Sequence, residues 1–370
     1  MPRVLLGTSA GSINAAYLAA KLHLGADEAT RGLVEFWRSL DKRDLIGWLA
    51  PTVMPALLAY AGRIFYLPTG GGSLAGFGRF PAVLDDAIGS WDQIQRNVDD
   101  GTIDAVGVVA TAAASGGTVV FLQAADGVPT PPFDEKDGIL YEPSALAGDH
   151  VLASCSIPVF FPPRRVDKPA AVRGWYWDGG TRLNTPIAPA LAIGVDRLVI
   201  VSTDPPRHPP PTFTGADEAK PDFDDALLHL IQATLGDPLV EDLHALVRVN
   251  RLVTGSGEET LDGRRVYPYL FAGPDRHGVL GRAAAQVLRN RYGGPLHALS
   301  DFAVLGRLFG RQGEQGAELQ SYLLFDSGFL ARLVDLGEEA GEQAWARGWL
   351  RDSLPPPGEA ATTRATPMRG

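Results

Sequence analysis

The stretch VLLGTSAGSINAAYL, residues 4–18, decides the expected fold. A short apolar run leads into GTSAG and then into an Ala- and Leu-rich segment with helical spacing. This strand–turn–helix context makes the G-x-S-x-G match a nucleophile-elbow prediction, with Ser9 at the apex of a sharp turn. Crowding explains the glycines at positions 7 and 11, because we expect a side chain at either position to clash with the strand and the helix. The chain has 43 glycines, so a chance match of five letters stays open at this point.

Ser9 would also lie at the N-terminus of the expected helix. Free N–H groups and the helix dipole favour developing negative charge at such a place. The sequence therefore predicts a serine nucleophile beside backbone donors.

Composition limits the class of protein. The chain has 370 residues, 45% of them hydrophobic and 21% charged, which is ordinary for a globular enzyme of one large or two modest domains. A net charge of −10 argues against nucleic acid as a partner. Cys155 is the only cysteine, so no intrachain disulfide can form. With no membrane-span run or signal peptide in the sequence, we expect a cytoplasmic protein.

The first two hundred residues alternate between helical and strand patterns. Ser115, Gly116 and Gly117 predict a hairpin turn between two of the strands. The run DRLVIVS, residues 196–202, has the continuous apolar pattern of a strand buried on both faces of a parallel sheet. Helices are expected over 12–24, 28–40, 81–88, 150–156 and 186–193, and strands over 4–6, 103–113, 118–122, 174–177 and 196–202.

A proline-rich break divides the chain. We predict a catalytic core over 1–204, a linker or surface loop over 205–221, a mostly helical region over 222–352 and a disordered tail over 353–370. Within the helical region the pattern favours helices over 223–253, 281–291, 296–309 and 319–349, and a strand over 266–270.

Asp178 is the second candidate residue. It ends the apolar segment GWYW and begins the turn DGG, where Gly179 and Gly180 let the backbone pass close to a neighbouring element. The carboxyl ends of strands form the ligand side of an open α/β sheet. Two such strand ends can bring Ser9 and Asp178 together. The alternative is a turn aspartate that bonds only its own backbone.

Taken together, the motifs resemble one family. GTSAG followed by SINAA, then ASCSIPVFFPP (153–163), DGGTRLNTPI (178–187) and GVDRLVIVS (194–202) occur in the order found in patatin-like phospholipases. The resemblance covers roughly residues 1–204. The later segments DPLVEDL and SYLLFD are similar to the C-terminal part of bacterial members.

The resemblance implies a three-layer α/β/α fold with a mainly parallel central sheet, followed by C-terminal helices. It also implies hydrolysis of lipid acyl esters, without calcium, by a Ser–Asp dyad in which Ser9 is the nucleophile and Asp178 the proton acceptor. Ala10 would offer a backbone N–H to the oxyanion. We expect no cofactor and no metal, since no His/Cys/Asp spacing fits a ligand pattern. Transient contact with a membrane surface follows from a lipid ester substrate, whereas the oligomeric state stays open.

The sequence departs from the family at its start. Members carry a strand and a glycine-rich turn upstream of the serine, and this turn supplies further oxyanion N–H groups. Eight residues before Ser9 cannot hold both. We favour an internal start over a shortened member, because the absent strand would leave a sheet edge exposed. In both cases we expect the chain as written to hydrolyse esters poorly.

Two other functions stay open. One is an esterase with a Ser–Asp–His triad, for which Asp149-His150 comes nearest to a suitable loop. The other is a non-catalytic lipid-binding or scaffold protein of the same fold. Packing is the favoured role of Cys155. For Arg164, Arg165 and Arg182, a solvated surface position and lipid-phosphate binding both stay open. The sequence context ties none of the seven histidines to a site; they are His23, His150, His208, His229, His244, His277 and His297.

Overall fold

The computed structural model describes residues 1–41, 44, 76–158, 160–208, 239–292, 321 and 324–356. The helix expected over 296–309, most of the 205–221 linker and the tail beyond residue 356 lie outside the described residues.

The expected strand–turn–helix unit at the start of the chain is confirmed. Strand β1 (Val4–Thr8) is followed by Ser9 and then directly by helix α1 (Ala10–Lys21), which begins two residues before the expected start. A single 3₁₀ turn, η1 (Leu22–Leu24), ends the helical segment at Gly25, whose φ of 100° suits glycine. Ser9 therefore lies between the carboxyl end of a strand and the first turn of a helix.

Within the described residues, six strands form the central sheet. Its order is β4-β3-β2-β6-β5, and β1 also pairs with β2. The bounds are β2 (Ala105–Ala112), β3 (Thr118–Ala124), β4 (Ile139–Pro143), β5 (Arg164–Val166) and β6 (Gly174–Asp178). Pairs β1–β2 and β3–β4 are parallel, whereas β2–β3, β2–β6 and β5–β6 are antiparallel. The α/β class is confirmed, and the sheet is more mixed than the expected mainly parallel one.

Short connections explain the mixture. The expected hairpin turn at Ser115–Gly117 joins β2 to β3, and a turn of this length can join only antiparallel neighbours. The β5–β6 pair is joined in the same way across residues 167–173, which contain the 3₁₀ turn η2 (Ala170–Val172). Neither β4 nor β5 was expected from the sequence.

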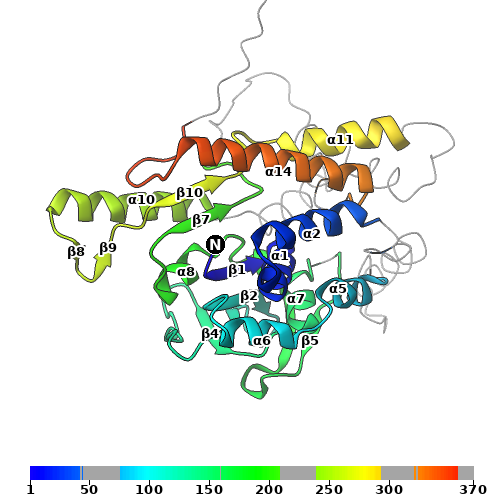
Figure 1. Cartoon of the computed structure of the whole chain (residues 1–370), viewed down its shortest axis with the longest axis horizontal. Helices are drawn as coiled ribbons and strands as arrows, with labels where there is room; N and C mark the ends of the chain where they lie inside the picture. Colours follow the sequence, from blue (N-terminus) through cyan, green and yellow to red (C-terminus); the bar gives the residue numbers. More distant parts are fainter. Residues whose placement is uncertain are drawn as a thin grey trace, which may run out of the picture.

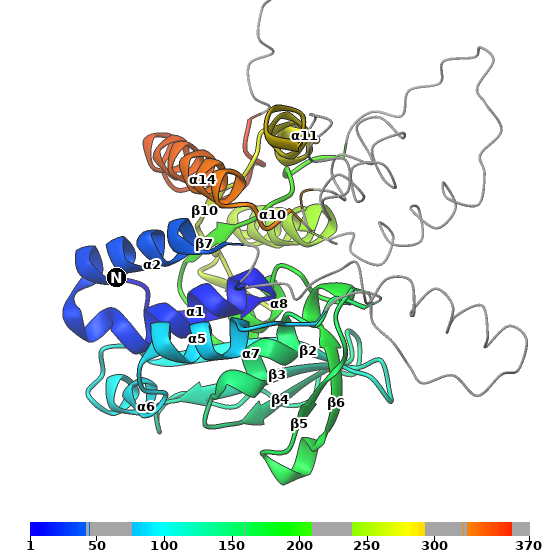
Figure 2. The same ribbon diagram turned by 90° about the vertical axis from the view of Figure 1, so that its right-hand side faces the viewer.

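Helices cover both faces of the sheet, as the three-layer prediction requires. Val106 and Val108 pack in one core with residues of α1, α5 (Phe80–Ile88), α6 (Asp92–Asp99) and α7 (Gly148–Ser154). Ala105 and Val109 point to the other face, where α8 (Ile187–Ile193) packs. Figure 2 shows α1, α5 and α7 lying along the sheet. Alternate residues of β2 thus bury opposite faces.

The C-terminal elements pack against the first two hundred residues. Strand β7 (Leu198–Val201) pairs in parallel with β10 (Tyr269–Ala272), and their buried face shares a core with α8 and α10 (Leu239–Ser256). A small hairpin, β8 (Thr260–Leu261) and β9 (Arg264–Arg265), follows α10. Figure 1 shows α14 (Ser327–Arg347) beside α11 (Val279–Tyr292), and α14 contacts both α2 (Ala26–Ser39) and β10.

The burial expected for residues 196–202 is wrong on one face. Leu198 and Ile200 are buried, but Val199 is 62% and Val201 72% exposed. Within the described residues β7 pairs only with β10, in a two-stranded sheet separate from the central one. One face of this strand therefore lacks the cover that a central strand receives from both sides.

Candidate active site

The turn that carries Ser9 has the strained backbone expected of a nucleophile elbow. Ser9 has φ 52° and ψ −125°, a region that residues with side chains rarely adopt. A Cβ on Gly7 would overlap the carbonyl group of Gly11, so the crowding expected at Gly7 is confirmed. The crowding expected at Gly11 is wrong, because a Cβ there would meet no atom within 4 Å. The helix folds back so that the Gly11 backbone, and not its side-chain position, lies over Gly7.

This difference predicts opposite outcomes for two similar substitutions. Gly7→Ala forces a methyl group into backbone that cannot move aside, and we expect a loss of about 3 kcal/mol of folding free energy. Gly11→Ala places a methyl group in open space on a helix, and we expect it to stay within about 1 kcal/mol of the native chain. Urea unfolding of both variants tests this. Equal losses in the two variants would contradict the account of the turn.

Asp178 lies at the end of β6 and is 2% exposed. Its Oδ2 accepts a hydrogen bond from Ser9 Oγ at 2.7 Å, and its Oδ1 accepts one from the Gly180 N–H at 2.7 Å. The second bond is the one expected of a turn aspartate, so the residue makes both predicted interactions. A Cβ on Gly179 would overlap the Val109 carbonyl oxygen. Gly179 therefore allows the close backbone approach expected of the DGG turn, here η3 (Gly179–Thr181).

The pairing of β2 brings the two residues together. Thr8 of β1 pairs with Val109, and Asp178 of β6 pairs with the next residue, Ala110. Strands β1 and β6 thus lie along the same edge of β2, run toward each other and meet end to end. Both side chains were expected at one shared edge of a parallel sheet. The structure instead joins them through an antiparallel β6, across 169 residues of sequence.

Burial changes the acidity of Asp178. It raises the pKa of the carboxyl group from 3.8 to about 7, against the opposing effect of the hydrogen bonds from Ser9 and Gly180. The expected direction of this shift is confirmed. A carboxylate with a pKa near neutrality is a much stronger base than an exposed aspartate, and it is still largely ionised at slightly alkaline pH.

The two backbone N–H groups beside the Ser9 hydroxyl differ in availability. The N–H of Ser9 donates to Ser154 Oγ at 2.8 Å. Ala10 is exposed and is the first residue of α1, and its N–H has no acceptor within the described residues. Ala10 is therefore the residue whose N–H is available to an incoming oxygen atom.

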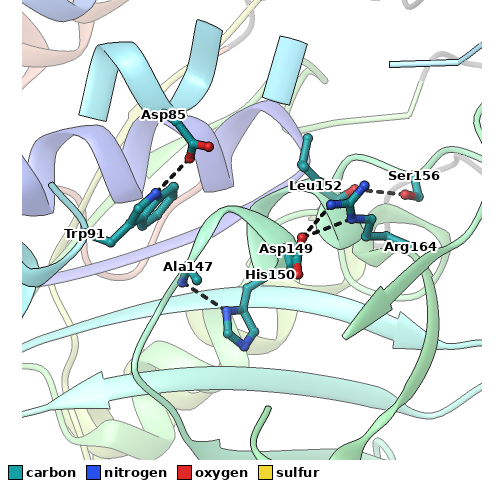
Figure 3. A network of polar contacts seen from close by, with 8 residues as sticks. All are labelled: Asp85, Trp91, Ala147, Asp149, His150, Leu152, Ser156 and Arg164. Carbon is teal, nitrogen blue, oxygen red and sulfur yellow. Dashed lines mark hydrogen bonds and ion pairs between the residues drawn. The ribbon is translucent and has the colours of Figure 1, made fainter. Parts of the chain in front are cut away.

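His150 is engaged in the structure of the fold. It is 3% exposed, its Nδ1 accepts the N–H of Ala147 at 3.0 Å, and its Nε2 lies 2.9 Å from the carbonyl oxygen of Lys168. Figure 3 shows the ring turned toward Ala147, whereas the neighbouring Asp149 points to Arg164. Asp149 and His150 thus do not form the acid–histidine half of a triad.

The His150 contacts predict a dependence of stability on pH. Burial lowers the pKa of His150 from its ordinary value of 6.5. As the pH falls through this value the unfolded chain takes up the proton first, so the stability due to the neutral ring is present above about pH 6.5 and is lost below it. We expect the difference in urea midpoint between the native chain and His150→Gln to shrink from pH 7.5 to pH 5.5. A constant difference would contradict this.

The remaining candidates have structural partners. Cys155 keeps some exposed surface, but desolvation and the nearby Asp178 raise the pKa of its thiol well above the ordinary value, which favours packing over nucleophilic attack. Arg164 pairs with Asp149 and Arg165 with Asp167, which favours a surface role for both arginines.

The part of the chain that the structure describes holds no group of three metal-ligating side chains. Among the described helices, none combines the length and the apolar character that a membrane span requires.

This fold and site define an α/β protein with a serine–carboxylate pair at a strand-to-helix turn. The family model for patatin-like phospholipases matches residues 1–191, more than half of the chain, and the chain belongs to this family. Membership suggests lipid acyl hydrolase activity. The match includes both Ser9 and Asp178. No curated protein matched the chain.

Sequence reasoning missed two residues that contact the Ser9 backbone. These are Ser12, whose Oγ donates to the Ser9 carbonyl oxygen, and Ser154 at the end of α7. The only signal for Ser154 was its place in the ASCSIP segment.

Proposed function

We propose that this chain is a lipid acyl hydrolase that cleaves carboxylic esters of phospholipids or other lipids through a Ser9–Asp178 dyad. The observation that carries the proposal is the 2.7 Å hydrogen bond from Ser9 Oγ to Oδ2 of the buried Asp178. A serine hydroxyl attacks an ester only when a base takes its proton, and this carboxylate is in place to do so.

The reaction has two halves. Asp178 takes the proton of Ser9 as Oγ attacks the ester carbonyl carbon, and the negative charge on the carbonyl oxygen is stabilised by the N–H of Ala10. The tetrahedral intermediate collapses to an acyl-enzyme, and the leaving alcohol takes the proton from Asp178. Water then attacks the acyl-enzyme as Asp178 takes its proton, and Asp178 returns this proton to Ser9 Oγ when the bond between Oγ and the acyl carbon breaks. The products are the fatty acid and free Ser9.

We also propose that turnover by this chain is slow. The dyad supplies a base and a nucleophile, but within the described residues Ala10 is the one backbone N–H beside Ser9 that we assign to the oxyanion. A single oxyanion donor is typically worth about 10²–10³-fold in rate. Rapid hydrolysis of a p-nitrophenyl acyl ester by the purified chain would contradict this proposal.

The function is tested by measuring fatty acid released from phospholipid vesicles and from p-nitrophenyl acyl esters, with and without a calcium chelator. We expect release from both substrates and no effect of the chelator, because the dyad needs no metal. Loss of activity on chelation would overturn the calcium-independent mechanism, and absence of release from every ester would favour the scaffold alternative. That alternative is kept because of the single assigned oxyanion donor.

The histidine variants separate the dyad from a triad. We expect each of the seven histidine-to-alanine variants that folds to keep its activity. A selective loss at one folded variant would favour a triad esterase.

Membrane contact is a separate proposal, which rests on the lipid substrate. Sedimentation with phospholipid vesicles tests it. Cleavage of soluble esters without any association with vesicles would count against contact.

A further inference from the structure

The unusual Ser9 backbone is held by two buried serines. The N–H of Ser9 donates to Ser154 Oγ at 2.8 Å, and its carbonyl oxygen accepts from Ser12 Oγ at 2.6 Å. Ser12 and Ser154 are both 0% exposed. The Ser12 bond is local to the start of α1, whereas the Ser154 bond spans 145 residues. Ser154 is therefore the side chain that ties the elbow peptide to another part of the fold.

The last residue of α7 and the two residues after it, Ser154–Ser156, contact both members of the dyad. Ser154 bonds Ser9, and two residues later the carbonyl oxygen of Ser156 accepts the N–H of Asp178 at 2.9 Å. Between them, Cys155 Sγ lies 3.8 Å from Ser12 Oγ. Helix α7 itself packs against β2, β6 and α1. This segment thus links the serine turn and the aspartate strand through one short stretch of backbone.

We propose that Ser154 is a positioning residue for the nucleophile. Its Oγ fixes the Ser9 peptide in the positive-φ conformation, and this conformation keeps the Ser9 hydroxyl aimed at Asp178 Oδ2 and the Ala10 N–H turned toward the acyl oxygen. Because Ser154 is fully buried, it acts through Ser9 and does not touch the substrate. The inference rests on the proposed Ser9–Asp178 hydrolase.

Loss of the acceptor has a defined consequence. Without Ser154 Oγ the Ser9 N–H has no partner, and relaxation of the strained peptide is then favourable. A displacement of about 1 Å at a reacting atom lowers a rate by roughly 100-fold. We therefore expect Ser154→Ala to lower kcat for a p-nitrophenyl acyl ester by about 100-fold, with KM changed less than about threefold, because the substrate contacts are not altered.

Two further variants make the test specific. Ser144→Ala removes another buried serine hydroxyl, one that bonds the Glu142 carbonyl oxygen and has no contact with the dyad, and we expect its kcat to stay within about threefold of the native value. Ser154→Cys places a weaker acceptor in the same space, and we expect its kcat to lie between those of the native chain and Ser154→Ala. If the alanine variant does not fold, we still expect the kcat of Ser154→Cys to be below the native value. Native kcat in Ser154→Cys and in folded Ser154→Ala, or an equal loss in Ser144→Ala, would overturn the proposal.

Crystal structures separate this proposal from the proposed function. We expect the Ser9 Oγ–Asp178 Oδ2 distance to lengthen beyond hydrogen-bonding range in Ser154→Ala, and to a lesser extent in Ser154→Cys, but to stay intact in Ser144→Ala. An unchanged distance in Ser154→Ala, or in Ser154→Cys if the alanine variant does not fold, would overturn the positioning role. An inactive native chain in which the distance responds as expected would instead show that the hydrolase assignment fails and the positioning contact stands.

Discussion

Ser9→Ala is expected to reduce ester hydrolysis by the chain to a small residual rate. Loss of the nucleophile removes the covalent route, and what remains comes from substrate binding and the Ala10 N–H. Knockouts of a catalytic serine lower kcat by up to about 10⁶-fold, so even a slow native enzyme has a wide range in which the loss is visible. Initial rates on a p-nitrophenyl acyl ester measure the effect.

The control for this experiment is a serine outside the site. Ser115 lies in the exposed β2–β3 turn, where its Oγ accepts the Gly117 N–H at 3.2 Å. We expect Ser115→Ala to keep the native rate. If Ser9→Ala also kept that rate, the ester-cleaving group would have to be sought elsewhere in the chain.

Asp178→Asn is expected to be less active and more stable than the native chain. The amide keeps an acceptor oxygen for the Gly180 N–H but cannot take a proton from Ser9. General-base catalysis is typically worth 10²–10⁴-fold, so we expect a loss of about 10³-fold in kcat. Steady-state rates at pH 8 test the activity.

The gain in stability has a definite dependence on pH. The carboxyl group of Asp178 ionises near 3.8 in the unfolded chain and near 7 in the folded one. The folded protein thus holds an extra proton between these values, and its stability falls as the pH rises through this window. The amide does not ionise, so Asp178→Asn should be more stable than the native chain by roughly 2–4 kcal/mol at pH 8 and by much less at pH 4. Urea unfolding at the two pH values measures the difference, and a variant that is less stable at pH 8 would contradict the buried charge.

The same ionisation shapes the rate profile of the native chain. Only the ionised carboxylate accepts a proton, so kcat/KM should rise with pH and level off above about pH 7. A profile that is already flat above pH 5 would indicate an aspartate with an ordinary pKa. This measurement needs no variant.

Local features of the fold were predictable because they depend on neighbouring residues. The apolar run before Gly7 and the helical spacing after Ser9 predicted β1 and α1, and Ser115–Gly117 predicted the hairpin. Strand β5 has only three residues, and β4 alternates burial in a loop-like sequence. Such short strands form because a neighbour pairs with them, which local sequence patterns do not reveal.

The candidate site was predictable in its residues but not in its assembly. The motifs identified Ser9 and Asp178, yet the end-to-end meeting of β1 and β6 depends on how both strands pair with β2. The role expected for Gly11 was wrong because it depends on which part of the helix folds back over Gly7. The contact from Ser154 arises from packing of α7 against α1 and was equally out of reach of the sequence.

The most direct test of the central claim is covalent labelling with a fluorophosphonate probe, followed by mass spectrometry of the labelled peptide. We expect one probe adduct per chain, located on Ser9, that disappears in Ser9→Ala and forms much more slowly in Asp178→Asn. Labelling that persists in Ser9→Ala, or a native chain that takes up no probe at pH 8, would contradict a Ser9 hydroxyl activated by Asp178.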